Sequence, residues 1–184
     1  MERSNKMRTV DMAYIALAAV LMALCSWISL NLGPVPFTLQ TFAVFLAIAV
    51  LGGKRGSLAV VVYLLMGAVG LPVFSNFSGG IGALLGTTGG YILGFFGSAL
   101  VMWAMEAAFG RKTWVLALSM VLGLLVCYAF GTAWFMQVYA RTSGPVGLAA
   151  ALGWCVIPYL VPDLVKIVLA LLLSKRLAKA IQLR

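Results

Sequence analysis

The sequence predicts an all-α, polytopic membrane protein with six transmembrane helices, forming one domain over residues 1–184. Composition is the first observation behind this prediction. Of the 184 residues, 64% are hydrophobic and only 9% are charged, whereas a soluble domain is usually about 25% charged. The second observation is that apolar segments long enough to be membrane helices alternate with short polar or basic breaks along the chain.

The third observation is the placement of the basic residues. The net charge is +9, and 11 of the 13 Lys and Arg residues fall in four short clusters at alternate breaks. The positive-inside rule therefore predicts that both termini are cytoplasmic. Short clusters between apolar spans indicate a lipid bilayer and no nucleic-acid partner. The clusters are Arg3, Lys6 and Arg8; Lys54 and Arg55; Arg111 and Lys112; and Lys175, Arg176, Lys179 and Arg184.

The first predicted helix covers residues 10–32, which is long enough to cross a bilayer. Ala16, Ala19 and Ala23 recur at helical spacing and form a stripe of small residues, which lets another helix approach closely. That helix could belong to a partner or to this chain. Asp11, near the start of the segment, is expected at the membrane interface.

The next break, residues 33–41, contains glycine and two prolines that end the first helix. Gln40 is one of several polar residues here that lie too close to apolar sequence for an ordinary loop. Two shorter helices are expected over residues 38–51 and 57–71, joined by a tight basic turn at 52–56.

Residues 70–91, GLPVFSNFSGGIGALLGTTGGY, form an uncharged stretch rich in glycine and polar groups. Backbone without side chains can approach a ligand closely, and Asn76 and Tyr91 add an amide and a phenol. Glycines at four-residue spacing from Gly82 to Gly94 form a face for close packing or ligand contact.

The remaining predicted helices are assigned in the same way. They cover residues 88–109, 113–138 and 158–179, with an apolar cap at 148–157 that is too short to span a bilayer.

The last helix carries Asp163 and Lys166 in otherwise apolar sequence. Pro162 suits the first turn of a helix, where Asp163 would meet the positive end of the helix dipole. The two charged residues are three positions apart and share one face. Charge inside a membrane usually marks a functional site. The alternatives are an ion pair that only neutralises itself, or a Lys166 that extends to the surface.

The polar breaks at residues 33–40, 70–91 and 141–162 all fall on the side opposite the basic clusters, which predicts a substrate site open to the outside. The chain has no histidine and four acidic residues, which leaves few candidates for acid–base catalysis and argues against an enzyme. No metal site is indicated, and the three cysteines are expected as free thiols. An ion-coupled transporter that works alone remains the alternative function.

Three motifs carry a family resemblance: GPVPFTLQTFAVFLA, the run YLLMGAVGLPVF followed by SGG and TGGY, and PDLVK near the end. In this order they closely resemble the BioY family, the biotin-specific S components of energy-coupling factor (ECF) transporters. The resemblance covers nearly the whole chain. It implies a six-helix S-component fold in a bacterial cell membrane, with biotin as the transported ligand and no cofactor. It also implies a partner module of one transmembrane coupling protein and two ABC-type ATPases.

The resemblance also implies roles for particular residues. The ligand contacts that it suggests are Asn76, Tyr91, Asp163 and Lys166, to which we add Gln40 and Gly82 from their places in the polar breaks. The docking residues that it suggests for the partner module are Ala19, Ala23 and Ala16. A ureido ring has N–H donors for Asp163 or Asn76, and a carboxylate would pair with Lys166.

Overall fold

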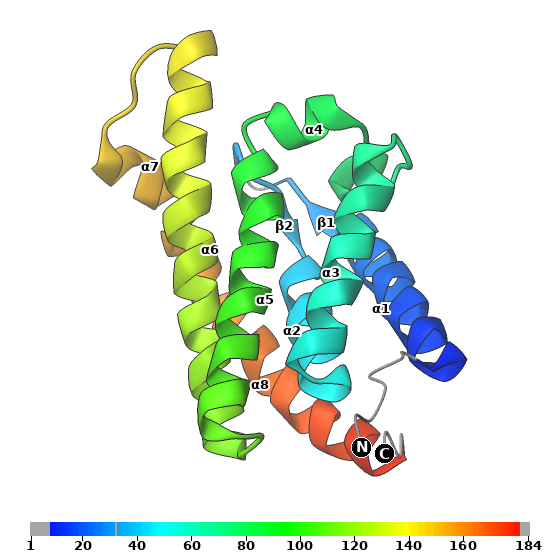
Figure 1. Ribbon diagram of the computed structural model, residues 1–184. Helices are drawn as coiled ribbons and strands as arrows, with labels where there is room; N and C mark the ends of the chain where they lie inside the picture. The colour runs from blue at the N-terminus through cyan, green and yellow to red at the C-terminus, as the bar shows by residue number, and fades with distance from the viewer. Residues whose placement is uncertain (1–7, 32, 181–184) are drawn as a thin grey trace.

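The computed structural model describes residues 8–31 and 33–180, and its helices follow the predicted order (Figure 1). The α-helices are α1 (Thr9–Trp27), α2 (Gln40–Leu51), α3 (Gly53–Ala68), α4 (Ile81–Leu85), α5 (Gly89–Phe109), α6 (Thr113–Thr142), α7 (Leu148–Cys155) and α8 (Ile157–Ala180). A 3₁₀ turn, η1, covers Ser75–Phe77, and two short strands, β1 (Ser29–Leu30) and β2 (Phe37–Thr38), pair antiparallel. The all-α class is confirmed.

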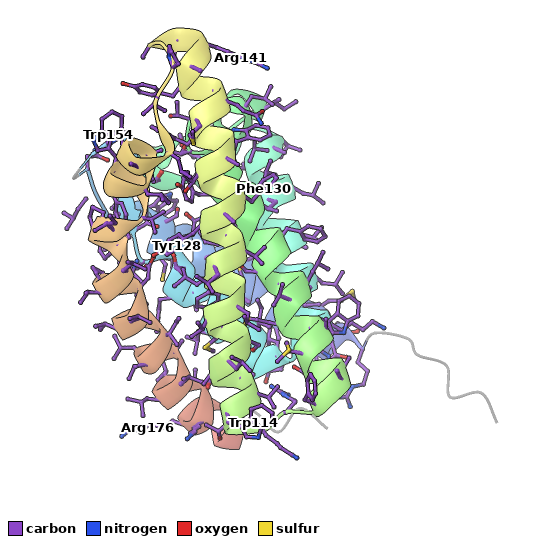
Figure 2. The ribbon with its side chains drawn as sticks, turned by 90° about the vertical axis from the view of Figure 1, so that its left-hand side faces the viewer. Trp114, Tyr128, Phe130, Arg141, Trp154 and Arg176 are labelled. Atoms are coloured by element: carbon purple, nitrogen blue, oxygen red, sulfur yellow. The ribbon has the colours of Figure 1, made fainter. Side chains whose placement is uncertain are left out.

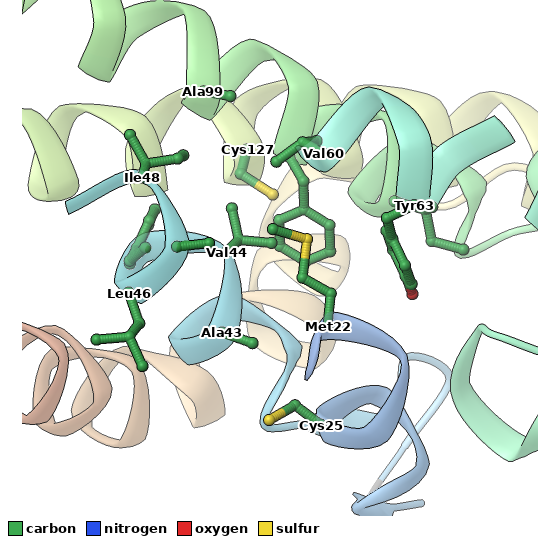
Figure 3. Close-up of a cluster of buried hydrophobic side chains, with 14 of the residues drawn as sticks. Met22, Cys25, Ala43, Val44, Leu46, Ile48, Val60, Tyr63, Ala99 and Cys127 are labelled. Carbon is green, nitrogen blue, oxygen red and sulfur yellow. The ribbon is translucent and has the colours of Figure 1, made fainter. Parts of the chain in front are cut away.

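Helix α2 is the centre of the fold. Every residue from 43 to 51 is buried, as expected of a helix that is hydrophobic on all sides. Helices α1, α3, α5 and α8 pack around it. Figure 3 shows Val44 and Ile48 of α2 among side chains from neighbouring helices, including Met22 of α1 and Val60 of α3.

Helix lengths bear on the predicted six spans. Four helices in the described part of the chain are long and apolar enough to cross a membrane: α1, α5, α6 and the Ile157–Leu177 part of α8. Several long apolar helices of this kind are typical of a membrane protein. Helix α2 has 12 residues and is therefore about 18 Å long, against a hydrocarbon core of about 30 Å. The total of six spans stays a prediction.

The first helix is shorter than predicted. It ends at Trp27, and Ser29 and Leu30 form strand β1, which pairs with Thr38 and Phe37 of β2. The helix therefore ends before it reaches the two prolines that were expected to stop it, because pairing between the strands draws the residues after Trp27 into extended backbone. Residue 32, the predicted helix end, lies outside the described residues.

The predicted basic turn over residues 52–56 is wrong. Gly52 alone separates α2 from α3, with φ +86°, a left-handed conformation that glycine adopts without steric cost. Helix α3 then starts at Gly53. The Gly53 N–H has no partner within its own helix, and it donates instead to Oε2 of Glu106 at 2.8 Å.

Asp11 is buried within the protein, and its predicted place at the membrane interface stays a prediction. It is 3% exposed, with Oδ1 3.2 Å from Nη2 of Arg55, and its Oδ2 accepts a hydrogen bond from the backbone N–H of Arg8. The pair joins the start of α1 to the start of α3. Arg55 can reach Asp11 because it lies in the first turn of α3 and not in a loop.

The basic residues gather at one end of the bundle, as the predicted alternation requires. The start of α1 and the end of α8 both lie towards this end of the bundle (Figure 1). Figure 2 places Arg141 at the opposite end of α6 from Trp114 and Arg176. We call the end that carries Trp114 and Arg176 the basic end. Its defining residues are Lys54, Arg55, Arg111, Lys112, Lys175 and Arg176. Arg3, Lys6 and Arg184 lie outside the described residues.

Glycines let α5 pack closely on α6. Gly90 faces the side chain of Trp134, Gly94 lies against Cys127, and Ser98 Oγ donates to the carbonyl of Gly123 at 2.7 Å. This part of the predicted glycine face therefore serves close packing between helices.

Candidate functional site

A cavity of about 70 Å³ lies in the half of the bundle opposite the basic end. It is bounded by the segment that ends in β2, by the first turns of α2 and α5, and by α6, α7 and α8. Its lining is largely apolar and aromatic, with one charged pair. The lining residues are Val35, Pro36, Phe37, Thr38, Gln40, Thr41, Ser75, Thr88, Tyr91, Ile92, Phe95, Leu124, Cys127, Tyr128, Cys155, Tyr159, Asp163 and Lys166.

The segment Val35–Thr38 is held against α8. The hydroxyl of Tyr159 donates to the carbonyl of Val35, and the rings of Tyr159 and Phe37 are stacked with centroids 6.3 Å apart. This segment therefore forms one wall of the cavity.

Lys166 points into the cavity and does not extend to the surface. Its Nζ lies 2.7 Å from Oδ1 of Asp163 and donates to the carbonyl of Thr38 at 2.6 Å. It also lies 3.9 Å from the ring centroid of Phe37, a favourable cation–π position. The side chains of Lys166 and Asp163 are 5% and 6% exposed. Two charges out of water need such partners.

Tyr128 supplies the second partner of Asp163. Its hydroxyl donates to Oδ2 of the carboxylate, while Oδ1 receives Lys166. Sequence reasoning did not find Tyr128, because it lies within a long apolar segment. One signal was available: membrane tyrosines usually lie near the interfaces, and a buried tyrosine hydroxyl usually has a hydrogen-bond partner.

The predicted place of Pro162 in the first helical turn is wrong. Helix α8 begins at Ile157, immediately after α7, so Pro162 lies inside the helix. Asp163 therefore lies in the second turn, and the helix dipole acts mainly within the first. Lys166 and Tyr128, and not the dipole, hold the Asp163 carboxylate.

The structure brings four of the six predicted ligand contacts to this cavity. Gln40, Tyr91, Asp163 and Lys166 all line it. Gln40 Nε2 donates to the hydroxyl of Tyr63 at 2.7 Å. The hydroxyl of Tyr91 lies 2.9 Å from Oγ1 of Thr132, so its ring faces the cavity from a fixed position.

Asn76 and Gly82 do not line the cavity. Asn76 is exposed, and its side-chain amide exchanges hydrogen bonds of 3.2 and 3.4 Å with that of Asn31. Gly82 lies in α4, and a Cβ built on it would meet no described atom within 4 Å. Their roles as ligand contacts stay predictions.

The alanine stripe of α1 divides between two environments. Ala19 is fully buried and Ala23 is 4% exposed, both in the hydrophobic core of this chain. Ala16 lies on the exposed face. For Ala19 and Ala23, the burial matches the alternative in which the small residues serve packing within the chain.

The three cysteines are free and buried, as predicted, and Cys127 and Cys155 line the cavity. No cluster of three potential metal ligands (His, Cys, Asp or Glu) occurs within residues 8–31 and 33–180.

Comparison with known proteins gives consistent matches. Residues 1–183 match the model of the BioY family. A protein of Thermotoga maritima named biotin transporter BioY is 45% identical over 159 residues, covering 86% of this chain and 90% of that protein. A probable biotin transporter BioY of Pyrococcus horikoshii is 40% identical over 171 residues, covering 93% and 98%. The fold matches the crystal structure of the S-component for biotin from an ECF-type ABC transporter, with TM-score 0.78 and 21% identity over 95% of both chains.

Proposed function

This chain belongs to the BioY family, and we propose that it is a membrane subunit that captures biotin from outside the cell and delivers it for uptake. The observation that carries the proposal is the buried Asp163–Lys166 pair facing a cavity with aromatic and aliphatic walls. Two relatives that are similar to this chain over most of its length are named as biotin transporters.

The lining of the cavity is suited to the chemistry of biotin. The ureido ring offers N–H donors to the Asp163 carboxylate, and the carboxylate of biotin calls for a cation such as Lys166. The thioether ring and the aliphatic chain need apolar contacts, which Ile92, Phe95 and Leu124 provide. A site of low polarity strengthens each of these polar pairings relative to water.

The energy for uptake comes, in this proposal, from an ECF module of one transmembrane coupling protein and two ABC-type ATPases. No phosphate-binding loop motif occurs in the chain. The core of α2 between the cavity and the basic end is apolar and buried, which disfavours an ion-coupled path through this chain alone. The protein acts as a binding subunit and not as an enzyme.

The test of this function is native mass spectrometry of the purified protein, followed by titration with biotin. We expect a one-to-one complex with biotin and weaker binding of desthiobiotin, which lacks the thioether ring. A protein that binds neither molecule would overturn the proposal.

The proposed orientation has both termini and the basic end in the cytoplasm of a bacterial cell, with six spans. Single cysteines at Ser78 and Lys54, in a background without the native three, report it directly. We expect a membrane-impermeant maleimide to label intact cells at residue 78 and not at residue 54. Labelling only at residue 54 would invert the topology.

The alanines of α1 distinguish docking from internal packing. Ala16→Trp adds bulk to an exposed face, so we expect reduced co-purification of the coupling module with unchanged thermal stability of the isolated subunit. Ala19→Trp places a large ring in a fully buried position, where overpacking costs about 1–3 kcal/mol or more, so we expect the isolated subunit to melt earlier. Full assembly of the Ala16→Trp variant would remove Ala16 from the docking surface.

A further inference from the structure

A second hollow, separate from the cavity, lies between α3 and α5 near the basic end, with a volume of about 200 Å³. We call it the α3–α5 groove. Apart from Lys54 and Ser57, its lining is entirely apolar. The hydroxyl of Ser57 already donates to the carbonyl of Ala99, so Ser57 offers no free donor to a ligand. The apolar lining residues are Leu58, Val61, Phe96, Leu100 and Trp103.

The α3–α5 groove runs from the basic end towards the middle of the bundle. Gly53 lies against Trp103 and Ser57 against Ala99, so α3 and α5 run antiparallel beside each other, as Figure 1 shows. Lys54 and Trp103 therefore lie at the basic end, and Val61 and Phe96 lie deeper in the bundle. From Lys54 to Val61 the helix rises about 10 Å. The groove opens on the outer surface of the bundle, where Leu100 is 42% exposed.

The charge at the open end of the groove is positive. Lys54 is exposed and has no ion pair within the described residues, whereas the neighbouring Arg55 is paired with Asp11. Glu106, the nearby acid, already accepts from the Gly53 N–H and lies 3.8 Å from Nε of Arg111. Trp103 beside Lys54 is typical of residues at a membrane–water interface.

From this combination we propose that the α3–α5 groove binds an anionic phospholipid, with one acyl chain along the groove and the phosphate at Lys54. The apolar walls match a hydrocarbon chain, and the exposed ammonium matches the phosphate at the depth where lipid headgroups lie. Free phosphate would lack the apolar contacts, and a zwitterionic lipid would lack the net charge. The site is independent of biotin and of the proposed transport function.

The experiment titrates the purified subunit with dioleoyl phosphatidylglycerol or dioleoyl phosphatidylcholine and counts bound lipid by native mass spectrometry. We expect the anionic lipid to be retained about fivefold more than the zwitterionic one, as one basic residue near a headgroup allows. Lys54→Gln should abolish this preference. Lys112→Gln, which removes another exposed lysine at the basic end outside the groove, should preserve it.

A second pair of variants tests the acyl chain. Leu100→Trp fills the groove and should lower retention of both lipids at least fivefold. Leu118→Trp, at a similarly exposed leucine of α6 (43%), should not. If Leu100→Trp does not fold, Val61→Phe closes the same groove from α3. The proposal would be overturned if Lys54→Gln still preferred the anionic lipid, or if Leu100→Trp retained lipid as well as wild type does. Equal losses of lipid in the control variants would also overturn it.

Discussion

Replacing Lys166 with Met is expected to weaken biotin binding by roughly 2–5 kcal/mol, the usual loss when one partner of a buried charge pair is removed. Methionine keeps most of the volume of the lysine stem. It removes the cation that contacts Asp163, the carbonyl of Thr38 and the ring of Phe37. In the proposed complex the carboxylate of biotin then has no counter-ion. Isothermal titration of wild type and variant measures the loss.

The neutral amide of biotin separates ligand contact from general damage. If Lys166 meets the ligand carboxylate, the amide should lose much less affinity than the acid on going from wild type to Lys166→Met. Asp163→Asn keeps an acceptor but adds donors, so it should weaken acid and amide alike through the ureido end. If the two residues only neutralise each other, the double variant Asp163→Asn/Lys166→Met would recover binding, and that recovery would refute the assignment.

Gly131→Ala is expected to disturb the cavity through Tyr91. A Cβ at Gly131 would overlap the ring of Tyr91, which borders the cavity and is held by Thr132. Alanine gains about 0.5–1 kcal/mol over glycine within a helix, but overpacking of a filled interior costs about 1–3 kcal/mol. The clash therefore decides the sign, and both thermal stability and biotin affinity should fall.

The matched control is Gly153→Ala in α7. A Cβ there meets no described atom within 4 Å, so only the gain in helix propensity remains and thermal stability should rise slightly. Thermal unfolding in detergent with and without biotin measures both variants. A Gly131→Ala protein that is as stable as wild type and binds biotin normally would show that Tyr91 is free to move.

The sequence predicted the helices well because hydropathy and glycine or proline breaks are local signals. It also predicted that Asp163 and Lys166 share a face, because their spacing fixes this in any helix. The start of α8 was misplaced because Pro162 alone suggested a first turn, while the helix begins at Ile157 and contains Pro162. The ion pair of Asp11 was not predicted because its partner, Arg55, is far away in sequence.

The parts of the site that the sequence did not reveal depend on which helices become neighbours. Tyr128 reaches Asp163 only because α6 lies beside α8, and Phe37 reaches Lys166 only because β2 folds over α8. The pairing of the Asn76 side chain with that of Asn31 was not predicted either. None of these tertiary contacts leaves a periodic signal in one sequence.

The long chain separation across the cavity has a consequence for biosynthesis. Thr38 and Lys166 are 128 residues apart, and Val35 and Tyr159 are 124 apart. At ordinary translation speeds, the cavity wall formed by residues 35–38 is synthesised on the order of ten seconds before its partners on α8. Because Asp163 and Lys166 neighbour each other within α8, each enters the bilayer with its counter-ion, which lowers the cost of inserting charge. The binding site is therefore completed only after α8 has left the ribosome and joined the earlier helices.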